Sequence, residues 1–245
     1  TPQAAAPRGG DGPAALVPTA TPALTLPASR LYHVQPGAGT HYLVETDPAF
    51  ADYRKWLSSD YMLEALGLDP AAIQKRLGDG FYEQRLITEQ VAQLTGRRLL
   101  PGHADDEAQY RALMNAGLTY ADEWQLVPGV ALSAEQMARL TSDIVWLVEE
   151  SVTLADGSTQ RVLVPRLYAS ADTVRLDTAG ELLTSGTIAG RQAVLLTGAD
   201  ISVERGAVVG RDVAVQASQD LTVLGGQILA ERTLQAGAGR DLRIE

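Results

Sequence analysis

The last part of the chain repeats a pattern of apolar and polar positions with a period of twenty residues. Residues 186–245 divide into GTIAGRQAVLLTGADISVER, GAVVGRDVAVQASQDLTVLG and GQILAERTLQAGAGRDLRIE. Each unit holds short stretches of alternating apolar residues, which are typical of β-strands. A period near twenty with such strands indicates a solenoid whose coils stack at the strand spacing of roughly 4.8 Å. We therefore predict a right-handed parallel β-helix of about three coils.

Three residue types recur at equivalent places in these coils. A glycine opens each unit, an arginine follows, and an aspartate comes nine positions after the arginine: Gly186, Gly206 and Gly226; Arg191, Arg211 and Arg232; Asp200, Asp220 and Asp241. Glycine permits tight corners without a Cβ clash. We expect the aspartates to bond turn amides, because a group repeated in every coil suits fold maintenance better than catalysis. A ladder of cation sites and a polysaccharide-cleaving groove are the alternatives.

Residues 31–150 have apolar positions at helical spacing. The pattern predicts helices over about 52–66, from Pro70 past Leu77, over 81–94 and 105–115, and one opened by a capping box at Ser133–Gln136 that buries Ile144 and Leu147. We predict a mainly helical domain here.

Two connecting segments flank this domain. Residues 1–30 contain six prolines, which favour an extended spacer. Residues 151–170 show strand character around Asp156-Gly157-Ser158, which predicts a β-hairpin, with Pro165 at an edge or a bulge. The β-helix repeats then occupy 171–245, with a degenerate first coil near 166–185. The fold class expected is α+β.

Composition narrows the possible functions. The formal net charge is −10 and no basic stripe occurs, so we expect no nucleic-acid partner. The chain has no cysteine, which excludes disulfides, thiolate nucleophiles and cysteine-based zinc sites. No apolar run is long enough to span a bilayer and no signal peptide is present, so we interpret the chain as a fragment of a longer protein.

Candidate chemistry is sparse. His33 and His41 lie near Glu45 and Asp47, but their spacing matches no standard metal site, and no hydrolase or nucleotide-binding motif occurs. We predict no catalytic residue, no metal and no cofactor. Three tyrosines beside charged residues are candidate exposed anchors for a partner: Tyr82, Tyr110 and Tyr120.

Several segments together resemble a known family. These are the repeats and HYLVETDPAF, WLSSDYML, GDGFYEQRLITEQVAQLTGRR, GVALSAEQMARLTSDIVWLVE and DGSTQRVLVPRLY. They are similar to the large exoproteins of bacterial two-partner secretion, within these to the filamentous haemagglutinin and CdiA-type contact-dependent growth inhibition proteins. The resemblance covers about residues 31–245.

The resemblance implies export through a dedicated outer-membrane transporter and display on the surface of a Gram-negative bacterium as a β-helical filament. CdiA-type members contact a receptor on a neighbouring bacterium and deliver a C-terminal toxin. The implied function is a non-enzymatic segment that presents or caps the filament for target-cell contact and toxin delivery. A host-directed adhesin is the first alternative, and a β-helical carbohydrate-active enzyme the second. The family supplies no catalytic residues for these positions.

Overall fold

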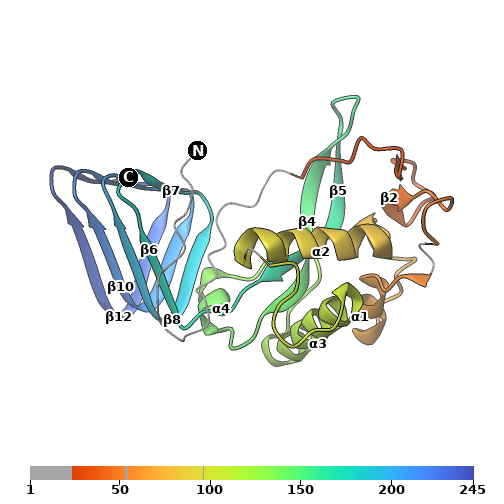
Figure 1. The fold of residues 1–245 in the computed structure, drawn as a ribbon, viewed down its shortest axis with the longest axis horizontal. Helices are drawn as coiled ribbons and strands as arrows, with labels where there is room; N and C mark the ends of the chain where they lie inside the picture. The colour runs from red at the N-terminus through yellow and green to blue at the C-terminus, as the bar shows by residue number, and fades with distance from the viewer. Residues whose placement is uncertain (1–23, 53–54, 96) are drawn as a thin grey trace. The chain divides into compact units, whose positions relative to one another are not determined.

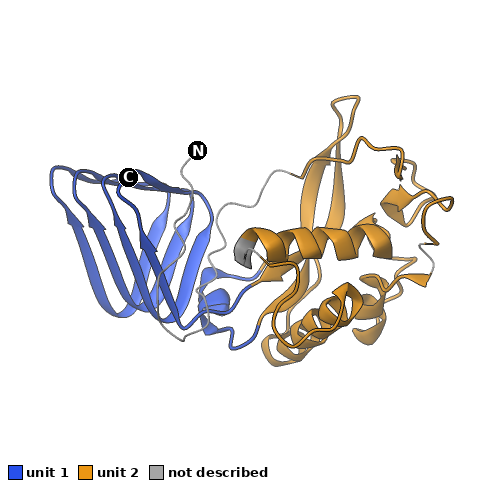
Figure 2. Ribbon diagram, in the orientation of Figure 1, with its two compact units in different colours: residues 1–22, 132–142, 169–245 blue, residues 23–131, 143–168 orange. Residues whose placement is uncertain are grey.

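The computed structural model describes residues 24–52, 55–95 and 97–245, and divides the chain into two compact units. Among these residues, unit 1 holds 132–142 and 169–245, and unit 2 holds those of 24–131 and 143–168 (Figure 2). Most of the spacer predicted at 1–30 lies outside the described residues.

Unit 2 is built on a five-stranded mixed sheet with helices packed against it (Figure 1). The strand order is β1-β2-β3-β5-β4, in which β2, β3 and β5 are parallel and the two outer pairs are antiparallel. The strands are β1 (Tyr32–Val34), β2 (Tyr42–Thr46), β3 (Arg76–Gly78), β4 (Ile144–Thr153) and β5 (Thr159–Tyr168). The helices are α1 (Asp60–Ala65), α2 (Gly80–Thr95) and α3 (Asp106–Trp124). Helix α2 packs against β5, and α3 against β4.

The expectation of a mainly helical domain over 31–150 is not confirmed, because the helices of this segment occur together with the strands of a five-stranded sheet. The segment from Pro70 to Leu77 forms no helix, because Asp69 accepts a hydrogen bond from the amide of Ala71 in a local turn and the chain then enters β3. The residues around Ile144 and Leu147 form the fully buried part of β4. A continuous apolar run of this kind has no period that separates a buried strand from a buried helix.

The remaining local signals are partly confirmed. The capping box at Ser133 and Gln136 is present, but its helix, α4 (Ala134–Arg139), ends before β4 begins. Among the described residues of 52–66, α1 is the one α-helix. Asp105 caps α3 by accepting from the amide of Ala108, and the helix runs on to Trp124, beyond the predicted end.

The predicted hairpin is confirmed as the antiparallel pair β4 and β5. Asp156 accepts a hydrogen bond from the amide of Ser158, and Gly157 has the positive φ of 83° that such a turn requires. Pro165 lies on β5 beyond the single residue pair that joins β5 to β3, so its missing amide costs no strand pairing on that side.

Unit 1 is a parallel β-solenoid, as predicted, with about four turns instead of three. Strands β6 (Thr173–Asp177), β8 (Thr187–Gly198), β10 (Ala207–Ala217) and β12 (Gln227–Ala238) form one sheet. Strands β7 (Leu182–Thr184), β9 (Ile201–Glu204), β11 (Leu221–Leu224) and β13 (Leu242–Ile244) form the other. The extra turn is the degenerate coil, which contributes β6 and β7.

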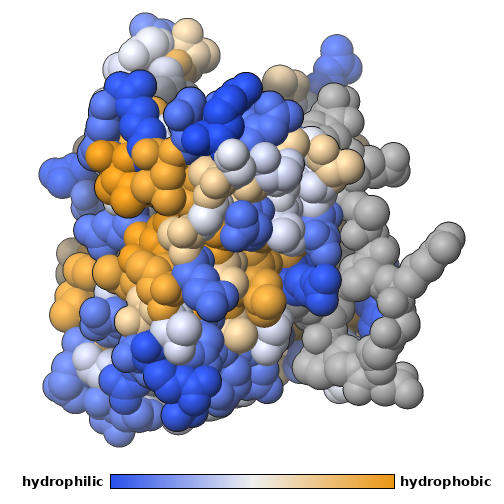
Figure 3. All heavy atoms as spheres, turned by 90° about the vertical axis from the view of Figure 1, so that its left-hand side faces the viewer, coloured by the Kyte–Doolittle hydropathy of each residue, from blue (hydrophilic) through white to orange (hydrophobic). Residues whose placement is uncertain are grey.

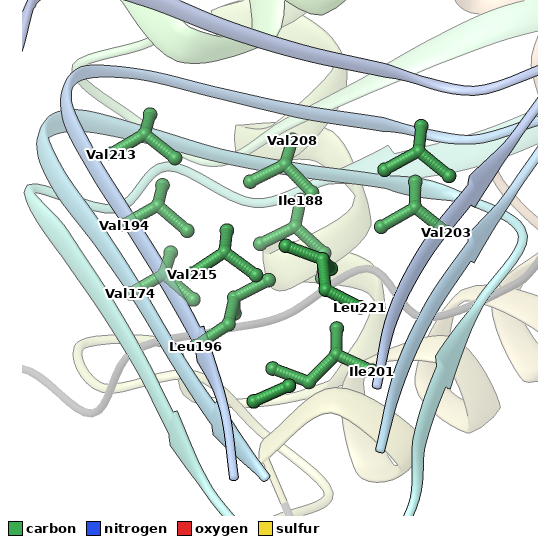
Figure 4. Packing of buried hydrophobic residues seen from close by; sticks show 12 residues of the cluster. Val174, Ile188, Val194, Leu196, Ile201, Val203, Val208, Val213, Val215 and Leu221 are labelled. Atoms are coloured by element: carbon green, nitrogen blue, oxygen red, sulfur yellow. The ribbon is translucent and has the colours of Figure 1, made fainter. Parts of the chain in front are cut away.

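Small aliphatic side chains fill the interior of the coils in columns (Figure 4). One column stacks Val174, Val194 and Val213, which are paired from strand to strand and at most 1% exposed. Helix α4 packs on the outside of β8 and β10, and buries Met137 together with the adjoining Leu140. The hydrophobic effect therefore holds the coils together from within and α4 to their outer face.

Candidate functional site

The repeated aspartates bond the backbone of the following coil. The carboxylate of Asp200 accepts a hydrogen bond from the amide of Asp220 at 3.2 Å, and Asp220 does the same for Asp241, also at 3.2 Å. Asp220 additionally accepts from the Nε of Arg240 at 2.7 Å, and this guanidinium lowers the pKa of the carboxyl group. Asp200 and Asp220 thus each link two coils at one turn, which is a structural use of the carboxylate.

Two of the repeated glycines, Gly206 and Gly226, lie where a side chain would meet the backbone of the preceding coil. An added Cβ at Gly206 would lie well inside van der Waals distance of the carbonyl oxygen of Gly186. The same atom at Gly226 would come within 2.9 Å of the carbonyl oxygen of Val203. Any side chain here would push the stacked backbones apart.

The repeated arginines lie at a corner whose length differs between coils. Arg191 pairs with Asp172 of the preceding coil at 2.6 Å and donates to the carbonyl oxygen of Leu140 at the end of α4. Arg232 pairs with Asp212 of its own preceding coil at 2.7 Å. The corner of Arg211 is one residue shorter than those on either side. Gly210 and Asp212 enclose one residue, whereas their partners in the neighbouring coils enclose two. Within the described residues Arg211 forms no ion pair.

The last coil leaves the apolar interior open. Leu234, which continues the column of Val213, is 51% exposed, and Leu242 and Ile244 of β13 are 48% and 69% exposed. Figure 3 views this side of the molecule and shows an apolar area on it. At the first coil, in contrast, Val174 of the same column is fully buried.

A second group of buried polar residues lies in unit 2, at the start of α2. Asp79 accepts hydrogen bonds from the backbone amide and the Oγ1 of Thr46 in β2, and from the amide of Tyr82 at 3.0 Å. Asp79 thus caps α2 and joins it to the sheet.

Glu83, one turn further along α2, is completely buried. It accepts from the amide and the Oγ of Ser59, both at 2.6 Å, and from the hydroxyl of Tyr110 at 3.0 Å. Burial raises the pKa of Glu83 to about 8 despite these three donors. The carboxyl group ties α1 and α3 to α2.

Arg76 of β3 is the buried cation of this region. Its guanidinium pairs with Asp60 at 2.9 Å, donates to the carbonyl oxygen of Pro70 at 2.6 Å, and lies 5.1 Å from the ring centre of Tyr42. The hydroxyl of Tyr42 in turn donates to Asp60 at 2.6 Å. Together with Glu83 this network holds the turns around β3, so we assign it a structural role.

The three predicted anchor tyrosines occupy different environments. Tyr110 is fully buried against Glu83 and Tyr120 is 8% exposed, so the expectation that these two rings are exposed is wrong. Both tyrosines lie on the side of α3 that faces the core. The prediction failed because helical spacing alone does not say which side of a helix faces solvent. Tyr82 is half-buried and packs edge-on against Tyr32 at 5.2 Å.

The surface around Tyr82 holds aromatic residues that sequence analysis did not single out. Trp56 is 39% exposed and packs edge-on against Phe81 at 4.9 Å, and Phe81 lies 6.5 Å from Tyr32. These rings come from three separate segments, so their clustering has no signature in local sequence. Trp56, Phe81 and Tyr82 are called the aromatic surface below, and Tyr32 is the buried ring that packs against two of them.

Metal chemistry has no support in the described part of the chain. No group of three or more histidine, cysteine, aspartate or glutamate side chains there could hold an ion. His33 instead bonds Asp47 at 3.2 Å. Across the same residues no helix is long and apolar enough to cross a membrane.

Comparison with known proteins gives a consistent group of relatives. The chain is 42% identical over 166 residues to the tRNA nuclease CdiA-2 of Burkholderia pseudomallei, and 42% identical over 156 residues to the toxin CdiA of Yersinia pestis. These matches cover 67% and 64% of the chain. The chain is also 32% identical to the filamentous hemagglutinin of Bordetella pertussis, and this match covers 95% of the chain. The chain is a segment of a CdiA/filamentous haemagglutinin-type exoprotein. Such exoproteins are secreted to the cell surface of Gram-negative bacteria.

The chain spans only a small share of these relatives. Each match covers 4% to 6% of the relative's own length. No protein-family profile and no solved structure matches the chain. The activities in the relatives' names therefore belong to proteins far larger than the portion aligned.

Proposed function

We propose that this chain is a non-enzymatic module of a surface filament in contact-dependent growth inhibition. The observation that carries the proposal is that one module aligns both with proteins named as nucleases and, over 95% of its length, with a protein named as a haemagglutinin. A part common to both is better explained by the architecture that they share than by nuclease activity. Asp200 and Glu83 bond backbone amides of the chain itself, and these structural roles agree with a non-enzymatic module.

In this proposal unit 1 supplies reach and stiffness, and further coils of the full-length protein continue its stack. Exposed core residues such as Leu234 and Ile244 support such a continuation, because exposed apolar surface and unpaired strand edges favour pairing with another strand. The buried first-coil residue Val174 supports a cap at the opposite end. The outer-membrane transporter of two-partner secretion would be the partner during export.

Unit 2 is the proposed site of target-cell contact, through the aromatic surface. Partly exposed aromatic rings beside an arginine are the usual composition of a binding hot spot. Arg85 provides that cation, because it donates to the hydroxyl of Tyr32 at 2.9 Å. A receptor on a neighbouring bacterium is the proposed partner. Host-cell adhesion is the second candidate, favoured by the haemagglutinin relative.

The deciding experiment measures binding of the fluorescently labelled chain to intact Gram-negative cells and to eukaryotic cells. Saturable binding to bacteria that is lost on Trp56→Ser and kept on Phe50→Ser would support receptor contact at the aromatic surface. Phe50 is a suitable control because it is 67% exposed and has no ring contact within the described residues. Binding to eukaryotic cells alone would favour the adhesin. No binding by a folded chain would leave only the architectural role.

A further inference from the structure

A groove runs along the outside of the solenoid, beside α4. Its volume is about 760 Å³, and all of its lining belongs to unit 1. One wall consists of Glu135, Ala138 and Arg139, which follow helical spacing along one side of α4. The floor and the other wall are the corners of three successive coils, near residues 190–192, 209–211 and 229–231.

The short corner at Arg211 gives this groove its shape. The two neighbouring corners each have one residue more between their strands, so the chain at Gly210 and Arg211 takes a shorter path. Arg211 is left exposed, and no ion pair of Arg211, Glu135 or Glu231 is found in the part of the chain that the structure describes. The rim therefore offers charges of both signs to a ligand.

The floor continues an apolar column that α4 covers only in part. Ala189, Val209 and Leu229 are neighbours across the strands and point away from the interior, since they alternate with Ile188, Val208 and Ile228. Ala189 and Val209 are 7% and 5% exposed, beneath α4. Leu229, one coil further along, is 39% exposed.

The spacing of the coils indicates what fits beside α4. Packed helices lie 8–10 Å apart, which is about two coil spacings of roughly 4.8 Å. Helix α4 covers β8 and β10, so a second helix alongside it would lie over β12, on Leu229. Ala138 permits close approach of the two helices, and the rim charges can pair with charged side chains that flank an apolar stripe.

We propose that this groove binds a short amphipathic helix of a partner protein, packed parallel to the coil face beside α4. The partner helix places an apolar side chain on Leu229, an acidic side chain on Arg211 and a basic one on Glu231. Helix α4 itself shows that this outer column accepts such a helix. The inference does not depend on the proposed function.

The test uses the α4 sequence as its probe, as the acetylated and amidated peptide ALSAEQMARLTSD, titrated into the isotope-labelled full chain and followed by amide chemical shifts. We expect saturable shifts at Gly210, Leu229 and Ala230. Replacing Leu229 by Glu should weaken binding about tenfold, since it removes the burial of a leucine side chain. Arg211→Gln should weaken it about threefold, because a partly exposed ion pair contributes little.

Leu195→Glu is the matched control, because Leu195 is 37% exposed on an outward position of β8 and does not line the groove. Its affinity for the peptide should stay within about twofold of the unmodified chain. The proposal is overturned if no saturable shift occurs at about 2 mM peptide, a concentration that detects weak association. It is equally overturned if Leu229→Glu leaves binding unchanged, which would mean that the peptide displaces α4 or binds elsewhere.

Discussion

The side-chain amide of Gln90 takes the place of a neighbouring strand at Leu167. Its Oε1 accepts a hydrogen bond from the amide of Leu167 at 2.9 Å, and its Nε2 donates to the carbonyl oxygen of Pro165 at 3.1 Å. Strand β5 has lost its partner β3 at this point, so two backbone groups would otherwise be buried without a hydrogen bond. Helix α2 thus completes the edge that the short β3 leaves open.

Replacing Gln90 by Leu should destabilise the chain by about 2 kcal/mol, because it leaves these two backbone groups unsatisfied in a buried place. Urea denaturation followed by circular dichroism measures the free energy of unfolding. Gln93 is exposed on the same helix, so Gln93→Leu should change it by less than about 0.5 kcal/mol. Equal effects of the two substitutions would contradict the role given to Gln90.

Glu83 makes the stability of the chain depend on pH in the unusual direction for a carboxyl group. Burial raises its pKa from 4.5 to about 8, so between these pH values the folded chain binds a proton that the unfolded chain has released. The contribution of Glu83 is therefore fully present below about pH 4.5 and is lost as the pH rises through 8. Ser59, Tyr110, Asp60 and Tyr42 are the polar groups around it.

Glu83→Gln removes this titration, so its stability relative to the unmodified chain should rise between pH 5 and pH 8.5. The comparison is made with urea midpoints at constant ionic strength. Glu89→Gln is the control, because Glu89 is exposed on the same helix and its difference from the unmodified chain should not follow this trend. A pH-independent difference for Glu83→Gln would show that the carboxyl group is ionised throughout.

Gly117 of α3 allows the helix to lie directly on β4. A Cβ added there would overlap the carbonyl oxygen of Val145 and lie 3.3 Å from the Cε of Met62. Gly117→Ala should therefore cost about 3 kcal/mol, although alanine favours a helix elsewhere. Thermal unfolding tests this, with the exposed Thr119→Ala as the control that should be neutral or stabilising. An unchanged melting temperature for Gly117→Ala would mean that α3 is free to move away from β4.

The sequence allowed the solenoid to be predicted but not the sheet of unit 2. A twenty-residue repeat shows the same apolar pattern in each coil. Core positions such as Ile188, Val208 and Ile228 can therefore be recognised by comparing the coils. Strand β3 has three residues and is buried on both faces, and β4 begins with five buried apolar residues, so neither alternates. The aromatic surface and the groove depend on segments brought together by tertiary packing, which one sequence does not reveal.

Asp220 contacts the next coil through a hydrogen bond from the amide of Asp241 and an ion pair with Arg240, and substitutions can distinguish the two contributions. Arg240, the ion-pair partner, is 60% exposed, and exposed pairs contribute little, so Arg240→Gln should leave the urea midpoint almost unchanged. Asp220→Asn keeps an acceptor for the amide of Asp241 and should have about the same effect. Asp220→Ala removes that acceptor and should lower the urea midpoint more than either of the other two substitutions. Urea denaturation at low and high salt distinguishes the two terms, because only the ion pair is screened by salt. If Asp220→Ala and Arg240→Gln lowered stability equally at both salt concentrations, the Asp220 carboxylate would act through its charge alone and not through the amide of Asp241.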